Sequence, residues 1–321
     1  MKIALTGIKP SGHPHLGNYL GMIRPALGLG AQYRCLYFIA DYHALTTLHD
    51  GKALREHTRA LAATWLALGL NPEEALLYRQ SDVPEIPELA WILSCFTGKG
   101  MLDRAHAYKD ALAQSREVSA GVYTYPVLMA ADILAFGAEV VPVGRDQKQH
   151  VEICRDIAQR FNHVYGELLT VPEAVIQEEV ETIPGLDGRK MSKSYDNTLP
   201  LFLDSGPLRK LVMRIATDST PVEAPKDPES APVFLLYRHM VGRETAEALA
   251  AQLRAGGTGW AAAKQALFEA LESVLGEART RYQQWMADRG ALDAVLRRGA
   301  ERARDLAAPR MEKIRHAVGV R

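Results

Sequence analysis

The stretch TGIKPSGHPHLGNYLG, residues Thr6–Gly21, joins a short apolar run to a helical pattern and decides how the fold begins. The run before it, Lys2–Thr6, predicts a strand. Gly7 and Gly12 bracket a tight turn, and Gly17 lies where a helix begins, so that a ligand can approach the backbone closely. The free N–H groups and the positive dipole end of this helix favour a phosphate site.

Two polar side chains lie at the start of that helix. His15 and Asn18 are three residues apart, on one face of the first turn. Both could donate hydrogen bonds to a phosphate that gains negative charge. An ordinary glycine- and proline-rich loop, capped by Ser11 or Asn18, explains the same residues equally well. The stretch alone therefore leaves both interpretations open.

Strand and helix patterns alternate through the first half of the chain. The predicted strands are Lys2–Thr6, Arg34–Asp41, Ala75–Gln80 and Ala138–Val143. The predicted helices are Asn18–Gly28, Lys52–Gly69, Pro87–Phe96, Val118–Phe136 and Gln147–Phe161. This alternation predicts an α/β fold with a doubly wound, mostly parallel sheet, which binds ligands at the carboxyl ends of its strands. The order of the strands stays open.

Helical patterns fill the rest of the chain. The segment Ala174–Pro200 is interpreted as a loop, and Thr220–Pro232, rich in proline and acid, as a linker. Amphipathic helices are predicted at Pro207–Thr217, Ala246–Ala255, Ala261–Trp285 and Leu292–Ala317. We expect a Rossmann-like domain over residues 1–200 and an all-helical domain over 201–321, whose last helix packs back on the first domain.

The composition is that of an ordinary globular protein, with 47% hydrophobic and 24% charged residues. Lys and Arg number 38, and so do Asp and Glu, which argues against a DNA-coating protein and requires a local basic patch for any nucleic acid. Three scattered cysteines indicate a reducing compartment without a cysteine-built metal site. Because no signal peptide or membrane span is visible, we expect a cytoplasmic protein without membrane or DNA partners.

Two further segments have the composition of a phosphate and ribose site. GRKMSKSYDN, Gly188–Asn197, places Lys190 and Lys193 in a loop. Such lysines can clamp a phosphoryl group in the transition state, where contacts raise the rate rather than the affinity, although a solvated basic loop is the ordinary alternative. In VVPVGRDQKQH, which starts at Val140, Asp146 is a candidate helix cap that could also bind a ribose hydroxyl.

One carboxylate is out of place in YPVLMAADIL, Tyr125–Leu134, which is otherwise apolar. Asp132 needs a partner there, because an unpaired charge in apolar surroundings is costly. By helical periodicity alone, a solvated carboxylate or a pairing with a distant arginine is the more ordinary interpretation.

Together these segments resemble the bacterial tryptophanyl-tRNA synthetases, class I enzymes of the subclass shared with the tyrosyl enzymes. HLGN, His15–Asn18, is similar to the HIGH signature of class I, with Asn in the last place, and KMSKS, Lys190–Ser194, matches the second signature in full. The segments around Asp132 and Gln147 are similar to the tryptophanyl enzymes in particular. The same resemblance extends to DYHALT (Asp41–Thr46), GELLTVPEA (Gly166–Ala174) and IATDST (Ile215–Thr220), and it weakens after about Pro221.

The resemblance implies ATP-dependent activation of L-tryptophan to tryptophanyl-adenylate, followed by transfer to tRNA(Trp) in translation. It implies a catalytic domain, a helical domain that binds the tRNA anticodon, a homodimer, and Mg²⁺ that arrives on the ATP phosphates with no resident metal. The implied catalytic residues are His15, Asn18, Lys190, Lys193 and Ser194. The implied ATP contacts are Lys9, Pro10, Ser11, Gly17, Asn18, Gly144, Arg145, Asp146, Ile183, Lys190, Met191, Ser192, Lys193 and Ser194. The implied tryptophan contacts are Tyr125, Met129, Asp132, Val141, Val143, Gln147 and His43, and Lys109 is implied for pyrophosphate.

The resemblance also gives Asp132 a partner. An indole offers one N–H on a large apolar body, which suits one carboxylate in an apolar pocket. Phenylalanine would leave that carboxylate unpaired, at a cost of about 1–3 kcal/mol or more. We therefore expect the partner of Asp132 to come from the substrate.

Three positions depart from the family pattern. Lys9 replaces the usual Gln and Leu5 a frequent Phe near the amino-acid pocket, so affinity there is expected to differ. Ala111 replaces the second lysine of the pyrophosphate loop, and Arg116 is a candidate to compensate. None of the three removes a residue that the basic chemistry needs.

Some features stay open at this stage. Trp91, Phe96 and Met101 are expected in a core or at a dimer interface. The basic C-terminal run is either a solvated helix face or a contact with tRNA phosphates; it comprises Arg297, Arg298, Arg302, Arg304, Arg310, Lys313, Arg315 and Arg321. Alternative functions are a tyrosyl or other HIGH-type nucleotidyltransferase, and a paralogue that binds tryptophan or tRNA without catalysis.

Overall fold

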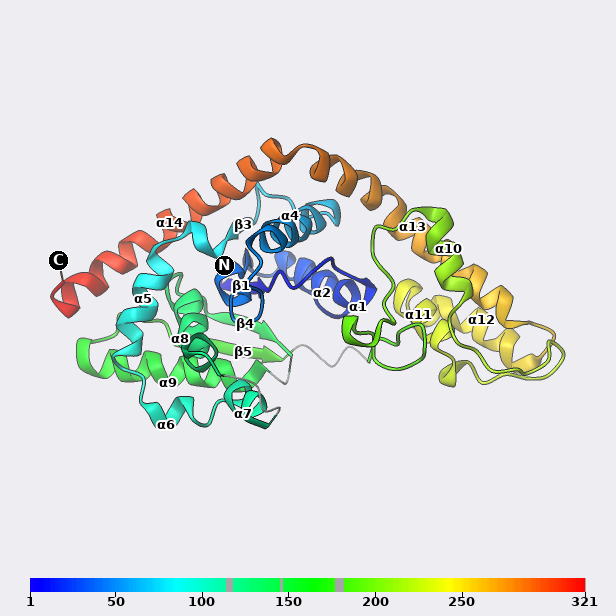
Figure 1. The fold of residues 1–321 in the computed structure, drawn as a ribbon, viewed down its shortest axis with the longest axis horizontal. Helices are drawn as coiled ribbons and strands as arrows, with labels where there is room; N and C mark the ends of the chain where they lie inside the picture. Colours follow the sequence, from blue (N-terminus) through cyan, green and yellow to red (C-terminus); the bar gives the residue numbers. More distant parts are fainter. Residues whose placement is uncertain (114–117, 145–146, 177–181, 321) are drawn as a thin grey trace.

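A computed structural model describes residues 1–113, 118–144, 147–176 and 182–320. Its centre is a five-stranded sheet in which all neighbouring strands are parallel (Figure 1). The strands are β1 (Ile3–Ile8), β2 (Arg34–Ile39), β3 (Leu76–Arg79), β4 (Val140–Val143) and β5 (Glu173–Ile176). The predicted α/β class with a doubly wound parallel sheet is confirmed.

The order of the strands, β3-β2-β1-β4-β5, reverses between β1 and β4. From β1 the chain builds outward through β2 to β3, and then returns to the other side of β1 to form β4 and β5. Such a reversal opens a crevice at the carboxyl ends of the two central strands. The segments that follow Ile8 and Val143 therefore begin at the same crevice.

Four strands lie close to their predicted positions, and the fifth corrects the prediction. β5 overlaps the segment from Ala174 that was interpreted as a loop. It is a short edge strand, and its residues Glu173–Ile176 pair one by one with Val140–Val143 of β4. Among the described residues its sheet neighbour is β4, which precedes it by about thirty residues. The four residues EAVI are too few to predict a strand by themselves, since strand preference depends strongly on the neighbouring strand.

Helices cover both faces of the sheet (Figure 1). The first predicted helix consists of α1 (Leu16–Asn18), a π-helical turn (Tyr19–Ile23) and α2 (Arg24–Gly28). The others in this half are α3 (Asp41–Ala44), α4 (Gly51–Ala67), α5 (Glu85–Ser94), α6 (Lys99–Leu102), α7 (His106–Ala113), α8 (Ala120–Leu134) and α9 (Lys148–Tyr165). The sequence did not predict α3, α6 or α7, because segments of eight residues or fewer show little helical periodicity.

The strands alternate their side chains between two cores. On one face the ring of Tyr37 lies 4.8 Å from that of Trp65 on α4. On the other face Leu5, Phe38 and Tyr78 pack with α5, α8 and α9. Burial of each large apolar side chain contributes roughly 1.5–3 kcal/mol, so both cores hold the carboxyl ends of the strands firmly in place.

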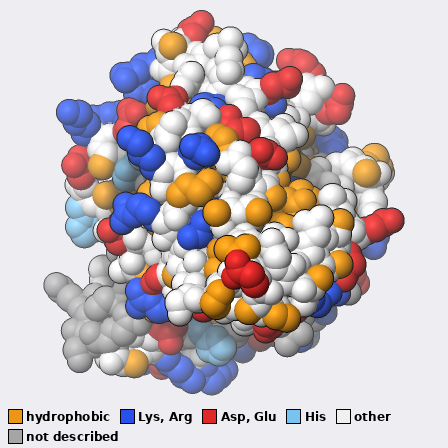
Figure 2. All heavy atoms as spheres, turned by 90° about the vertical axis from the view of Figure 1, so that its right-hand side faces the viewer, with side chains coloured by type: hydrophobic (Ala, Val, Ile, Leu, Met, Phe, Trp, Pro, Cys, Tyr) orange, Lys and Arg blue, Asp and Glu red, His pale blue; other side chains and the backbone are white. Residues whose placement is uncertain are grey.

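The chain after residue 200 is helical, as predicted. Its helices are α10 (Ser205–Met213), α11 (Pro232–Val241), α12 (Arg243–Ala255), α13 (Trp260–Ala287) and α14 (Arg289–Val318). The sequence missed α11. The predicted linker before it is mostly exposed, but its backbone is held by the buried Lys226, which donates hydrogen bonds to the backbone oxygens of Pro221, Val222 and Ala224. Figure 2 shows this end of the molecule, where basic, acidic and apolar side chains mix.

The last helix, α14, runs back along the outside of the sheet (Figure 1). At Gly299 it approaches β3 so closely that an added Cβ would lie 1.9 Å from the backbone oxygen of Leu77.

The predicted boundary between the two domains at residue 200 stays a prediction. None of the helices in the described ranges combines the length and apolar character that crossing a bilayer requires.

Four arginines of the C-terminal run hold α14 against the α/β part, a role that neither interpretation of that run included; a contact with tRNA phosphates stays a prediction. Arg315 forms a bidentate pair with Glu88 at 2.7 and 2.6 Å. The other three contacts are Arg302 to the backbone oxygen of Pro72 (2.6 Å), Arg304 to Glu85 (3.4 Å) and Arg310 to the backbone oxygen of Leu168 (3.3 Å). Arg297, Arg298 and Lys313 remain exposed, and Arg321 lies outside the described residues.

Candidate functional site

The glycine-rich stretch and the Lys190–Ser194 loop meet beside the crevice. The backbone N–H of Leu16 donates to the backbone oxygen of Leu199 at 2.8 Å, and that of Gly17 lies 3.2 Å from the sulfur of Met191. The ammonium of Lys193 lies 3.4 Å from the backbone oxygen of Ser11. Two motifs more than 170 residues apart in sequence thus form one surface.

The loop that carries Lys190 and Lys193 is held by the buried Asn197. Its Nδ2 donates to Asp187 at 2.7 Å and to the backbone oxygen of Lys190 at 3.1 Å, and its Oδ1 accepts from the backbone N–H of Ser192 at 2.8 Å. Sequence reasoning missed Asn197, although it ends the quoted segment GRKMSKSYDN. Its amide positions a loop that is otherwise exposed.

His15 is buried and neutral at ordinary pH. Burial, followed by the positive charge of Lys193, lowers its pKa to about 4. Its Nδ1 is buried without a hydrogen-bond partner among the described residues. The Oδ1 of Asn18 accepts from the backbone N–H of His15 at 3.1 Å, so Nδ2 is the atom of Asn18 that can serve a ligand. Both side chains therefore present donors without adding charge.

Gly12 and Lys193 form a close contact. Gly12 has a φ of +124°, and a Cβ there would lie 2.9 Å from the ammonium of Lys193. Burial lowers the pKa of Lys193, since an ammonium group loses hydration there. A bound phosphate would compensate the ammonium group of Lys193 for the hydration that it loses on burial, so this arrangement suits an anion.

The other residues predicted to contact ATP have different surroundings. Ile183 and Met191 are buried and pack in the core, and their contact with ATP stays a prediction. Lys190 is exposed, and the hydroxyls of Ser192 and Ser194 lie 2.7 Å apart. Pro10, Ser11 and Gly144 lie in the loops that follow β1 and β4. Arg145 and Asp146, as well as Arg116, lie outside the described residues.

The predicted tryptophan contacts gather on the opposite side of the sheet from α4. Tyr125, Met129 and Asp132 lie on one face of α8, since they are spaced four and three residues apart. Val141 and Val143 come from β4. Val141, Met129 and Val143 all belong to the apolar cluster on that face, so they can provide the wall of an apolar pocket.

Asp132 has two protein partners, which corrects the expectation that its partner comes from the substrate alone. The side chain is 1% exposed. His43 Nε2 lies 2.9 Å from Oδ2, and Gln80 Nε2 donates to Oδ1 at 2.8 Å and to Oδ2 at 3.0 Å. Burial raises the pKa of Asp132, and the contacts with His43 and Gln80 act against that rise. The structure thus brings together His43 and Asp132, two residues that the resemblance implied as tryptophan contacts.

Sequence reasoning missed Gln80, and it placed His150 near a helix start at the carboxyl end of a strand without assigning it a contact. Gln80 was visible as a polar residue at the carboxyl end of a predicted strand, which is where ligands bind. His150 is buried, with its Nε2 close to the hydroxyl of Tyr125 and its Nδ1 3.1 Å from Oε1 of Gln147. It therefore joins two of the predicted contacts, Tyr125 and Gln147.

The three residues that depart from the family pattern have different surroundings. Lys9 donates to the hydroxyl of Thr46 at 2.9 Å, and burial lowers its pKa. Leu5 is 2% exposed in the core below the site. Ala111 is buried on α7, whereas Lys109 on the same helix is exposed. A lysine in place of Ala111 would therefore have to leave the interior to reach a ligand.

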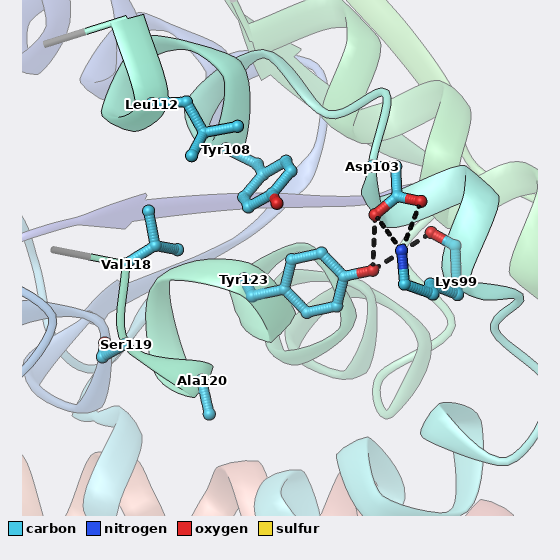
Figure 3. A pocket seen from close by; sticks show the side chains of 8 residues that line it. All are labelled: Lys99, Asp103, Tyr108, Leu112, Val118, Ser119, Ala120 and Tyr123. Atoms are coloured by element: carbon cyan, nitrogen blue, oxygen red, sulfur yellow. Dashed lines mark hydrogen bonds and ion pairs between the residues drawn. The ribbon is translucent and has the colours of Figure 1, made fainter. Parts of the chain in front are cut away.

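A separate pocket of about 350 Å³ lies between α6, α7 and the start of α8 (Figure 3). The rings of Tyr108 and Tyr123 meet edge to face at 5.0 Å, and the hydroxyl of Tyr123 donates to Asp103 at 2.9 Å (Figure 3). None of the predicted ATP or tryptophan contacts lines this pocket. It is therefore not part of the candidate site.

Comparisons with known proteins agree on one family. The model described as tRNA synthetases class I (W and Y) matches residues 2–276. The tryptophan–tRNA ligase of Pseudomonas aeruginosa is 52% identical over 99% of this chain and 73% of its own length, and that of Xanthomonas axonopodis pv. citri is 51% identical over 99% and 76%. The structure of tryptophanyl-tRNA synthetase from Campylobacter jejuni, complexed with ADP and tryptophan, is 42% identical, covers 99% of both chains and superposes with a TM-score of 0.93.

Proposed function

The chain belongs to the class I tRNA synthetase family of the tryptophan and tyrosine enzymes, and we propose that it is a tryptophan-specific member. It activates L-tryptophan with ATP to tryptophanyl-adenylate and diphosphate, and it transfers the tryptophanyl group to tRNA(Trp) in translation. The observation that carries the specificity is the buried carboxylate of Asp132 on the face of α8 that also carries the apolar Met129. A single acceptor in an apolar wall matches an indole N–H.

Adenylate formation requires positioning and charge stabilisation rather than proton transfer. The ionised carboxylate of tryptophan attacks the α-phosphorus of ATP, a P–O bond to the α-phosphorus forms, and the bond to the bridging oxygen of diphosphate breaks. We assign the stabilisation of the phosphate charge to the neutral His15 and Asn18 on one side and to Lys190 and Lys193 on the other. Ser194 would support the loop through its contact with Ser192.

We assign Mg²⁺ to the ATP phosphates. The described residues contain no cluster of His, Cys, Asp or Glu that could hold a metal ion. The groups around the glycine-rich stretch are donors and cations, so phosphate oxygens and water would supply the ligands of the ion. Lys109 on α7 is the proposed contact for the departing pyrophosphate.

We also infer a homodimer that acts in the cytoplasm, where translation uses charged tRNA. Trp91 on α5 is 73% exposed, which is unusual for so large an apolar side chain, and a second copy would cover it. Phe96, by contrast, packs on Phe161 in the core at 5.2 Å. Sedimentation of the intact protein should give twice the chain mass, and Trp91→Glu should weaken the dimer.

One experiment tests the proposed function against its alternatives. ATP–pyrophosphate exchange is measured with each of the twenty amino acids, followed by acylation of tRNA(Trp). Exchange that depends on tryptophan supports the proposal. Exchange that depends on tyrosine would identify a tyrosyl enzyme, and the absence of exchange with any amino acid would point to a binding protein.

A further inference from the structure

Gln80 lies fully buried at the carboxyl end of β3, between the backbone of α3 and the carboxylate of Asp132. Its Oε1 lies 3.1 Å from the backbone nitrogen of Tyr42 and 3.4 Å from that of His43. Backbone N–H groups can only donate, so the amide oxygen must face them. The NH₂ group must then face Asp132, and the surroundings leave the amide one orientation.

The same amide determines which acceptor positions of Asp132 remain. A carboxylate accepts about four hydrogen bonds. Gln80 bridges both oxygens, at 2.8 and 3.0 Å, and His43 adds a contact of 2.9 Å to Oδ2. Three contacts are thus provided by described residues, and about one acceptor position is left for a ligand. Because Gln80 contacts both oxygens, it fixes the plane of the carboxylate, and this plane sets the direction in which the remaining acceptor position points.

We propose that Gln80 is a specificity-positioning residue: its side-chain amide orients the carboxylate of Asp132 so that the remaining acceptor position receives the indole N–H of tryptophan. This inference rests on the proposed function and deepens it. Gln80 itself contacts neither the indole nor the reacting atoms. It acts through Asp132 and ties that residue to the start of α3, which also carries His43.

The charges around Asp132 explain why an amide suits this position. The ionisable groups that face it are Asp41 and His43 from α3, Tyr78 from β3 and Cys154 from α9. Asp41 is itself a buried carboxylate, held by the backbone N–H of Ser81 at 3.0 Å. A further acid would crowd negative charge, whereas an amide supplies N–H donors without charge.

The test compares Gln80→Met and Gln80→Glu with the wild type in tryptophan-dependent exchange from pH 6 to 8.5. In Gln80→Met the KM for tryptophan should rise about tenfold at every pH, because the donors are lost. Discrimination against phenylalanine should fall by a similar factor. The KM for ATP and the kcat at saturating tryptophan should change less than threefold, since Gln80 lies away from the phosphate motifs.

Gln80→Glu adds a pH signature that a merely structural role would not produce. At low pH the introduced carboxylic acid still donates one hydrogen bond to Asp132. As the pH rises, that proton is lost and two adjacent carboxylates repel each other. The KM for tryptophan should therefore increase with pH in Gln80→Glu, relative to both Gln80→Met and the wild type. Gln265→Glu on α13, the same chemical change far from the sheet, is the matched control.

The outcomes separate this inference from the proposed function. If the wild type shows no tryptophan-dependent exchange, the proposed function fails and the inference with it. If the wild type is active and both Gln80 variants keep its KM and its discrimination, only the inference is overturned. Should both variants fail to fold, Gln80→Asn decides, because this shorter amide keeps the chemistry but cannot bridge Asp132 and α3. Retained discrimination in Gln80→Asn would then overturn the inference.

Discussion

Asp132 combines complete burial with hydrogen bonds from both sides, and the choice of substrate should depend on it. Asp132→Asn keeps the size of the side chain but replaces an acceptor oxygen with N–H donors. Since mismatched buried hydrogen-bonding groups cost about 1–3 kcal/mol, kcat/KM for tryptophan should fall roughly 10- to 100-fold. The value for phenylalanine should change little. Exchange kinetics with both amino acids measure this, with Asp305→Asn on the exposed face of α14 as control. Equal discrimination in Asp132→Asn and the wild type would contradict the assignment.

Lys193 should act on the rate rather than on affinity. Its ammonium lies against the glycine-rich turn, which is where the proposed function places the ATP phosphates that gain charge. Lys193→Ala should slow adenylate formation by roughly 100- to 1000-fold, as expected for loss of one charge-stabilising group. The dissociation constant for tryptophan should stay within about threefold. Single-turnover kinetics and equilibrium dialysis measure the two quantities, and Lys210→Ala on α10 is the control. An unchanged rate of pyrophosphate exchange would rule out this role.

His15 should make the stability of the fold depend on pH. Its pKa is about 4 in the folded protein against an ordinary value of 6.5. Between these values the unfolded chain binds a proton that the folded chain does not, so the contribution of His15 is complete above pH 6.5 and is lost as the pH falls towards 4. Urea unfolding from pH 6.5 to 4.5 should show a shallower pH slope in His15→Gln than in the wild type. The exposed His316→Gln is the control, and equal slopes in all three proteins would exclude the effect.

At the scale of elements, the contact between α14 and β3 depends on a single glycine. Gly299 has no room for a side chain, because a Cβ would overlap the backbone oxygen of Leu77. Gly299→Ala should lower the free energy of unfolding by about 1–3 kcal/mol or more, as overpacking does. Gly276→Ala on α13 meets no atom closer than 3.8 Å and should stabilise that helix slightly. Chemical denaturation of both variants tests this, and equal effects would show that the close approach is unimportant.

The elements that the sequence predicted well are those with long, regular patterns. The helices α4, α8, α9, α13 and α14 lie close to their predicted ranges, since ten or more residues carry a clear period. The missed elements are short or depend on a neighbour. The strand β5 needs β4, and α3 is a single turn at the end of β2. Such elements owe their stability to tertiary packing rather than to local preference.

At the scale of the whole molecule, four arginines of α14 join the C-terminal helix to the α/β part, and we expect Arg315 to hold the fold together rather than to bind tRNA. Arg315 and Glu88 form the bidentate ion pair among these contacts, at 2.7 and 2.6 Å. Arg315→Ala should lower the free energy of unfolding by about 1–3 kcal/mol, because it removes two charge-assisted hydrogen bonds. The KM for tRNA should change less than about threefold. Arg297→Ala, at an exposed position of the same helix, serves as the comparison in unfolding and acylation assays. A large loss of tRNA affinity in Arg315→Ala alone would contradict this assignment.

The sequence by itself determined the strand, turn and helix at the start of the chain and the face of α8 that carries Asp132, and it singled out the two motifs that we propose bind phosphate. All of these are local patterns of spacing and residue type, which can be recognised without knowing which residues lie nearby in the folded structure. It also identified most of the residues that the structure brings together, including His43, because the motifs resemble those of a known family.

Only the tertiary structure decided the strand order, the strand β5, and the partners of the buried charges. Gln80 and His43 are 52 and 89 residues away from Asp132, and Glu88 is 227 residues away from Arg315. Pairing over such distances depends on how the elements pack, and a side chain's own neighbours in sequence do not encode it. For that reason a carboxylate without a partner in its own helix is one member of a network, and four arginines of the basic run contact the α/β part.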